Sequence, residues 1–159
     1  MVKNELDNNI QNIDLSIFNK KKFSINGDPN KILELDVSDL NIISRLKEQY
    51  VVLDELTEKV ASIKEKTENL TDDRELVEVL GTELKQIDDQ MRDCIDKIFD
   101  SNVSEICVPT GSMYDPVAGK LRFEHLIDIL IKLYDQNLTE EVNKIQNRVS
   151  KHTSKYIKK

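Results

Sequence analysis

A histidine with nearby carboxylates is the first group in this chain whose residue types and spacing could support chemistry. His125 follows Glu124, and Asp128 lies three residues further on, so these side chains could contribute ligands to a metal site. The chain has two histidines, and neither has a second His or Cys at the spacing of known metal motifs. We therefore expect His125 to be a surface or capping residue, and we expect no metal and no other cofactor.

The two cysteines, Cys94 and Cys107, raise the question of thiol chemistry. Cys107 with His125 could form a nucleophile and its base, but distance along the sequence does not establish that geometry. Two thiols are also too few for the disulfide framework of a secreted scaffold. We interpret both as reduced, mostly buried side chains, which favours a reducing cytoplasm.

Two pairs of neighbouring acidic residues resemble the carboxylates of general acid–base catalysis: Asp72 with Asp73, and Asp88 with Asp89. Each pair falls on a predicted exposed helix surface, where solvated charge explains it better. Residues 110–112 (TGS) and 119–120 (GK) fall short of the G-x-x-x-x-G-K-[ST] pattern of a phosphate loop. We therefore predict a non-enzymatic protein that works by binding other proteins.

Charge is unevenly distributed along the chain. The net charge is −7, and residues 142–159 carry six Lys or Arg and no acid, which leaves the rest of the chain at −13. Lysines near a helix C-terminus favour its dipole, which accounts for the basic tail, although an acidic protein partner or nucleic acid remains an alternative. The acidic body disfavours nucleic-acid binding, because phosphate affinity comes from clustered Lys and Arg.

The N-terminal third of the chain predicts a flexible arm followed by a β-hairpin. Residues 1–19 are rich in Asn and Asp, whereas residues 22–37 alternate apolar and polar side chains around a turn at 26–30 (NGDPN). A lone hairpin is marginally stable in water, so its apolar face must pack on another element.

The remainder predicts a mainly α fold, with residues 20–159 forming a single domain. Apolar residues recur at intervals of three and four, which is the spacing of amphipathic helices. Ser38 and Thr139 are suitable N-caps for two of these helices. Residues 100–119 hold two of the three prolines and predict a long irregular connection. The expected helices, of which the first two form an antiparallel hairpin, cover about 38–66, 72–99, 121–136 and 139–157.

Two stretches of the sequence resemble a known group of proteins: FSINGDPNKILELDVSDLNIISRL and IFDSNVSEICVPTGSMYDPVAGKLRFEHLIDIL. They are similar to small tail-module proteins of bacteriophages and prophages of Gram-positive bacteria, and the order of elements resembles that of tail assembly chaperones. The resemblance implies a cytoplasmic protein of the bacterial host that binds the tape measure protein and keeps its hydrophobic helices soluble until the tail tube forms. It brings no enzymatic residues.

The narrow apolar stripes are first of all core, but a second copy or a partner helix could complete one of them. We place the partner surface on the stripe of the first long helix and around the 107–123 loop. The residues of this hypothesis are Leu46, Tyr50, Leu53, Cys107, Met113, Tyr114 and Phe123.

Two other functions remain open at this stage. One is a structural virion protein, such as a head–tail connector or a component of the tail tube. The other is a helical regulator that binds nucleic acid through its basic tail. No run of about 18 apolar residues and no N-terminal secretion signal is present, so we expect no membrane association.

Overall fold

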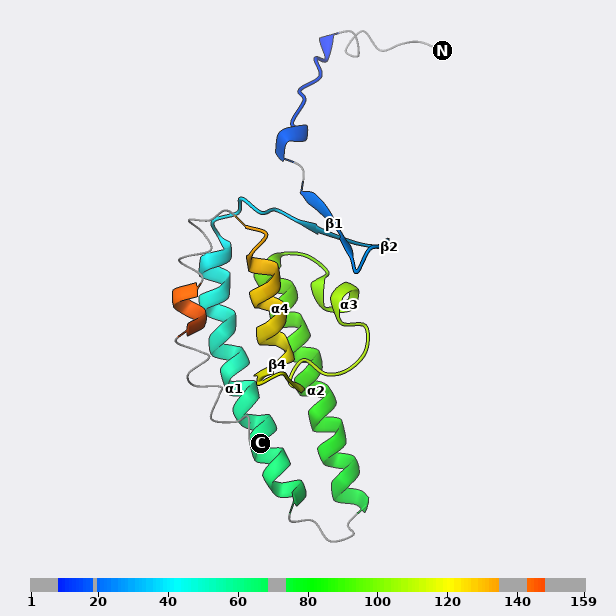
Figure 1. Cartoon of the computed structure of the whole chain (residues 1–159), viewed down its shortest axis with the longest axis vertical. Helices are drawn as coiled ribbons and strands as arrows, with labels where there is room; N and C mark the ends of the chain where they lie inside the picture. Colours follow the sequence, from blue (N-terminus) through cyan, green and yellow to red (C-terminus); the bar gives the residue numbers. More distant parts are fainter. Residues whose placement is uncertain (1–8, 19, 69–73, 135–142, 148–159) are drawn as a thin grey trace.

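A long pair of α-helices is the largest feature of the computed structural model, which describes residues 9–18, 20–68, 74–134 and 143–147 (Figure 1). Helix α1 spans Ile42–Glu68 and helix α2 spans Arg74–Phe99. The two helices lie side by side and run in opposite directions. The predicted mainly helical fold with a long helical hairpin is therefore confirmed.

The spacing of apolar residues explains why the two helices pair. The buried residues of α1 run from Ile42 to Ile63 at intervals of three and four, and those of α2 run from Leu80 to Ile98 in the same way. Residues at these intervals share one face of a helix, so each helix buries a single stripe. The core lies where the two stripes meet.

Helix α1 begins four residues later than predicted, because acidic side chains hold the preceding segment in turns. The Asp36 carboxylate accepts hydrogen bonds from the backbone N–H and the hydroxyl of Ser38, which therefore does not act as the N-cap. Asp39 accepts a hydrogen bond from the Asn41 N–H and pairs with Arg45 at 2.7 Å. Burial alone would raise the pKa of Asp39, but these partners more than offset it and lower that pKa.

The N-terminal hairpin is present, with a tighter turn than predicted. Strands β1 (Lys21–Ile25) and β2 (Asp28–Leu35) pair in antiparallel fashion. Asn26 and Gly27 have φ of 53° and 74°, the left-handed values that a two-residue hairpin turn requires. The predicted five-residue turn is therefore wrong: residues 28–30 belong to β2, where the register shifts and accommodates a proline.

The apolar face of this hairpin is buried. Phe23 lies opposite Leu33, and Leu33 and Leu35 have no exposed surface. In Figure 1 the hairpin lies across one end of the helix pair. The Ser101 hydroxyl donates a hydrogen bond to the Glu34 carbonyl, and the Lys20 ammonium donates one to the Asp100 carbonyl, so polar contacts also attach the hairpin to the end of α2.

The segment predicted to be irregular contains three short elements. Helix α3 spans Val103–Cys107, and strands β3 (Pro116–Val117) and β4 (Lys120–Leu121) form a small second hairpin. Its turn residues, Ala118 and Gly119, have φ of 49° and 85°. Elements of two to five residues are too short for a hydrophobic period to reveal them.

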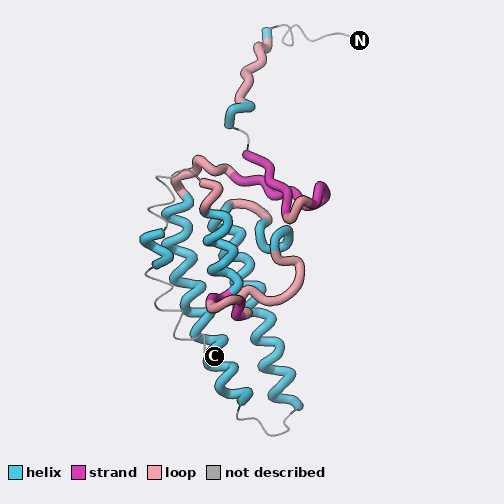
Figure 2. The backbone as a smooth tube through the Cα atoms, in the orientation of Figure 1, coloured by secondary structure: helices cyan, strands magenta, loops and turns pink. Residues whose placement is uncertain are grey.

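Helix α4 (Arg122–Ile131) follows β4 directly and lies along the end of the helix pair that carries the first hairpin (Figure 2). The helix ends at Ile131, before the predicted end at about residue 136, because hydrogen-bonded turns follow at Leu133 and Tyr134. Residues 143–147 are helical and fall within the last predicted helix. The rest of that helix, the basic tail from 148 onward, Asp72 with Asp73, and the first eight residues of the arm lie outside the described residues.

Two glycines with no neighbouring atom near the position of an added Cβ provide a matched test of how backbone conformation affects stability. Gly81 lies inside α2, and a methyl group there meets no other atom within 4 Å, so Gly81→Ala should raise the free energy of unfolding by about 0.5–1 kcal/mol. Gly119 is equally open but has φ of 85°, so Gly119→Ala should lower it by about 1 kcal/mol. Urea denaturation measures both changes. Equal effects of the two substitutions would contradict this assignment.

Candidate protein-binding surfaces

The three residues predicted to form a partner surface on the first long helix lie in the core instead. Leu46 and Leu53 have 0% of their surface exposed and Tyr50 has 3%. A partner cannot reach these side chains while the protein is folded. Their apolar spacing therefore reflects packing, the interpretation that we placed first for every stripe, and the candidate surface must be sought elsewhere.

The predicted loop residues divide into two groups. Met113 and Phe123 have no exposed surface, whereas Cys107 and Tyr114 are half-buried and pack at the edge of the core. The structure brings the loop against α1, where Tyr114 and Leu121 lie close to Thr57 and Val60. The loop is thus largely a part of the core, with two of its predicted residues reaching the surface.

Arg92 of α2 is the residue that holds this loop in place. Its guanidinium pairs with Asp88 at 2.9 Å and donates hydrogen bonds to the backbone carbonyls of Ser104, Val108 and Gly111. A planar group with five N–H donors is suited to binding several acceptors at fixed angles. The loop therefore follows a path set by one side chain of the long helix.

Two acidic side chains on the same face of α2 extend this arrangement. Asp88 accepts a hydrogen bond from the Met113 N–H at 2.7 Å, and Asp96 accepts bonds from the N–H and hydroxyl of Ser104 at the start of α3. The prediction that Asp88 is a solvated surface charge is therefore wrong, whereas Asp89 is exposed as expected. The sequence signal that could have revealed this face is an acidic residue, an arginine and a second acidic residue at intervals of four.

A second arginine fixes the other end of the loop. Arg122 donates to the Ser112 carbonyl and pairs with Asp115 at 3.1 Å. A side chain at Gly111 would place its Cβ 2.0 Å from the Arg122 guanidinium, so glycine is required for this close approach. The TGS element at residues 110–112 therefore serves loop geometry in this structure.

The residues considered for chemistry have structural contacts. A ring nitrogen of His125 contacts the Val117 carbonyl and links α4 to the second hairpin. Burial raises the pKa of the Cys94 thiol to about 11 and also raises that of Cys107, which lowers the thiolate fraction on which nucleophilic reactivity depends. Within the described ranges no group of three or more His, Cys, Asp or Glu could hold a metal ion. No helix in the same ranges is long and apolar enough to span a membrane.

A polar contact also holds the helical residues 143–147 against the body. Gln146 is buried and donates a hydrogen bond to Asp128 of α4 at 2.9 Å, while Lys120 pairs with the other oxygen of Asp128 at 2.8 Å. Desolvation raises the pKa of the neighbouring Tyr50 hydroxyl far above its ordinary value, against a hydrogen bond from Gln146. This contact attaches residues 143–147 to α4.

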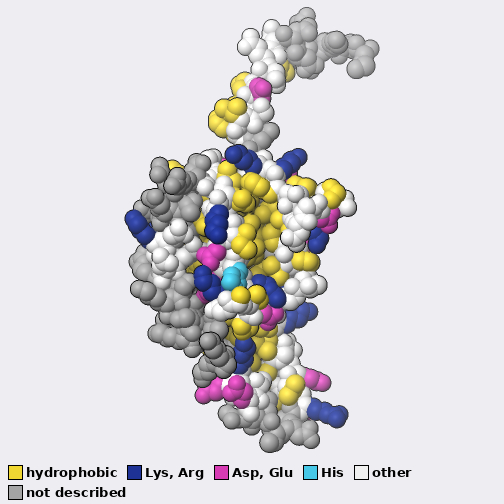
Figure 3. All heavy atoms as spheres, viewed as in Figure 1, with side chains coloured by type: hydrophobic (Ala, Val, Ile, Leu, Met, Phe, Trp, Pro, Cys, Tyr) yellow, Lys and Arg dark blue, Asp and Glu magenta, His cyan; other side chains and the backbone are white. Residues whose placement is uncertain are grey.

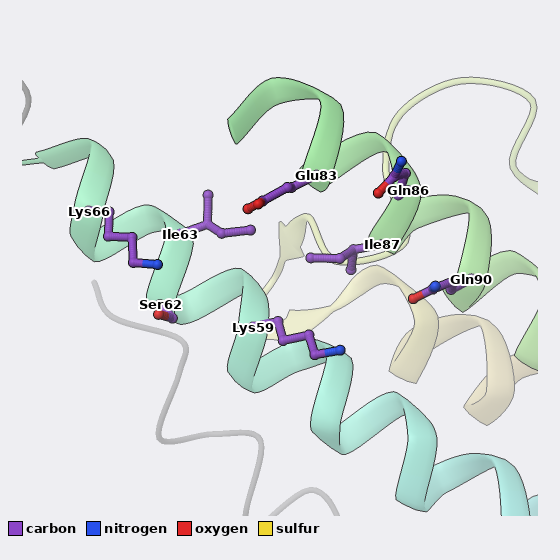
Figure 4. A pocket seen from close by; sticks show the side chains of 8 residues that line it. All are labelled: Lys59, Ser62, Ile63, Lys66, Glu83, Gln86, Ile87 and Gln90. Atoms are coloured by element: carbon purple, nitrogen blue, oxygen red, sulfur yellow. The ribbon is translucent and has the colours of Figure 1, made fainter. Parts of the chain in front are cut away.

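An open groove lies between α1 and α2 near the tip of the helix pair (Figure 4). It has a volume of about 330 Å³, and its floor consists of Ile63 and Ile87. Side chains from both helices point toward one another across it in Figure 4. Its other lining residues are Lys59, Ser62 and Lys66 of α1 and Glu83, Gln86 and Gln90 of α2.

The groove opens on the face of the helix pair that faces away from α4. The loop and the second hairpin meet α1 at Thr57, Val60 and Ala61. Lys59 and Ser62, which line the groove, lie on another side of this helix, because successive residues are rotated by about 100° around its axis. In Figure 4 the ribbons of the second hairpin and α4 pass behind the helices. The sequence analysis missed this groove because it depends on how two helices pack.

Exposed apolar side chains also lie outside the groove: Val51 and Val52 on α1, Leu76, Val77 and Val79 on α2, and two further groups. Ile129 of α4 and Leu133, in the turn after that helix, are exposed, and Figure 3 shows apolar atoms on the face that carries α4. On the N-terminal arm, apolar atoms appear again, well separated from the body (Figure 3). The candidate surfaces are therefore the groove, the outer face of α4 and the arm.

The fold and these surfaces define a mainly helical protein in which a long helix pair carries an N-terminal β-hairpin and a loop pinned by arginine. In comparison with known proteins, the chain matches no family model, no curated protein and no solved structure.

Removing the Arg92 side chain should release the loop. Arg92→Met leaves Asp88 without its ion-pair partner and three carbonyls without their donor, so we expect the free energy of unfolding to fall by about 2–4 kcal/mol. Amide hydrogen exchange at residues 104–113 should accelerate as well. The matched control is Lys97→Met, which removes the exposed Lys97–Asp93 pair and should change stability by less than about 0.5 kcal/mol. Unchanged exchange in the loop would contradict the role of Arg92.

Proposed function

We propose that this chain is a non-enzymatic protein of the tail-assembly-chaperone type, which binds an amphipathic helix of the tape measure protein in the groove between α1 and α2. The observation that carries the proposal is the groove itself: an open, apolar-floored channel between two helices. Burying the apolar face of a helix in such a channel is a common mode of peptide recognition.

The floor of the groove supports binding of an apolar helix face. Ile63 and Ile87 are each 5% exposed, so they close the bottom of the channel and themselves offer a partner little surface. Closer to the tip of the pair, Leu76 and Val79 of α2 are more exposed and lie at helical spacing from Glu83 and Gln86. The apolar floor therefore continues along α2 beyond the hollow, as a docked helix of several turns requires.

The rim of the groove defines the chemistry of the partner. Lys59 and Lys66 line the α1 side, whereas Glu83 lies on the α2 side with Gln86 and Gln90. A complementary helix carries acidic residues along the flank that meets α1 and basic residues along the flank that meets α2. Charges at a rim of this kind select the orientation of the partner more than they increase its affinity.

The charge of the chain supports a holding role. A net charge of −7 favours solubility of the chain and of its complexes, while the groove covers the apolar face of the partner. Exposed apolar helices associate unless they are covered. The resemblance to tail-module proteins supports the choice of the tape measure protein as the source of that helix.

A side chain that fills the groove should abolish binding. Gln86→Trp places a large ring in the channel, and we expect at least a tenfold loss of affinity, about 1.4 kcal/mol. The control is Lys85→Trp, because Lys85 is also exposed but lies about 100° around the helix and does not line the groove. Both variants are co-expressed with a tape measure protein from a phage of a Gram-positive bacterium, and its soluble fraction and its capture on the tagged chain are measured.

The result expected is a soluble, captured tape measure protein with the parent chain and with Lys85→Trp, and an insoluble one with Gln86→Trp. Equal solubility of the tape measure protein with and without this chain would remove the holding role. Equal capture by the two Trp variants would show that binding occurs elsewhere than in the groove.

A further inference from the structure

The N-terminal arm exposes an unusual amount of apolar surface. Between 56% and 85% of the surface of each of its large apolar side chains is accessible. These residues are Ile10, Ile13, Leu15, Ile17 and Phe18. In Figures 1 and 3 the arm extends away from the body, whereas Ile17 and Phe18 at its base line a hollow with Leu35 and Val37. A folded monomer rarely leaves such a contiguous patch in water, which indicates that another surface covers it.

The arm has the pattern of a β-strand with one apolar face. Ile13, Leu15 and Ile17 alternate with Asn12, Asp14 and Ser16. In an extended chain the first three would point to one side and the polar three to the other. The arm therefore suits a position beside an existing strand whose inner face is apolar and whose outer face is polar.

Strand β1 offers such a position. Among the described residues it pairs only with β2, which leaves its other edge open. Phe23 lies on its inner, apolar face, and Lys22 lies on its outer face, where it pairs with Glu34. Lysines at positions 20, 21 and 22 disfavour direct pairing of this edge with β1 of another copy, because like charges would meet.

Charge complementarity identifies the arm as the strand that this edge accepts. Asp14 is the one charged residue of the segment 9–18, and it falls on the polar side of the alternation. In a strand added beside β1, Asp14 lies on the face of Lys22, while Ile13 and Leu15 lie on the face of Phe23. The arm thus provides both the acid and the apolar face that the open edge lacks.

The arm does not lie along the β1 edge of its own chain. Ser16–Phe18 forms the short 3-10 helix η2, closed by a hydrogen bond from the Phe18 N–H to the Leu15 carbonyl, and the arm extends away from the body (Figure 1). The complementary edge is therefore the one on a second copy of the chain.

We propose that two copies of this protein exchange their N-terminal arms, residues 10–15 of each copy adding as a strand to the open edge of β1 in the other. A hollow of about 210 Å³ lies at the base of the arm, lined on one side by Ile17 and Phe18 and on the other by Leu35 and Val37. It provides room for apolar side chains of the incoming arm.

This contact is separate from the groove between α1 and α2, so it can be tested independently of the proposed function. The test is a charge exchange between copies of the full chain. Asp14→Lys places a lysine on the face of Lys22, and Lys22→Glu places an acid on the face of Asp14. Each variant alone should associate with itself at least tenfold more weakly than the parent chain, measured by sedimentation velocity and light scattering.

Mixing the two variants decides whether the contact joins different copies. In the mixture both contacts are again between opposite charges, so a mixed dimer should form from two weakly associating partners. As a control, Val51→Asp alters an apolar side chain of α1 that is 61% exposed, and it should leave association unchanged. A monomeric parent chain, or a mixture that associates no better than its components, would overturn the proposal.

Discussion

The seam between α1 and α2 is the packing interaction on which the rest of this structure depends. It orders two helices of 27 and 26 residues whose apolar residues each form a single stripe. Isolated helices of ordinary sequence are marginal in water, so their stability comes from this burial. Every other element attaches to the pair: the first hairpin across one end, α4 along one face and residues 143–147 beside α1.

The helix pair also provides the polar groups that fix the irregular part of the chain. Asp88, Arg92 and Asp96 follow one another at intervals of four residues on α2, and they bind backbone groups between Ser104 and Met113. A long loop normally has many conformations of similar energy, and several partly buried hydrogen bonds to one rigid helix select one of them. The order of the loop is therefore a property of α2.

Packing and binding compete for the same apolar residues in a protein of this composition. Hydrophobic residues make up 38% of the chain, and the core takes the stripes of both long helices. Among the described residues, the candidate surfaces for partners include the groove between the two helices, the outer face of α4 and the arm. The groove and the arm differ in kind, because the groove suits a helix and the arm has the alternation of a strand.

The sequence by itself determined the helices, the first hairpin and the polar character of the surface, because period and turn chemistry are local properties. It placed Leu46, Tyr50 and Leu53 on one stripe but could not determine whether that stripe meets core or partner. Likewise, the interval from Asp88 to Arg92 was visible, but the carbonyls that Arg92 binds come from residues 12 to 19 positions away. Only tertiary structure brings those groups together, because burial and long-range hydrogen bonds depend on how elements pack in space.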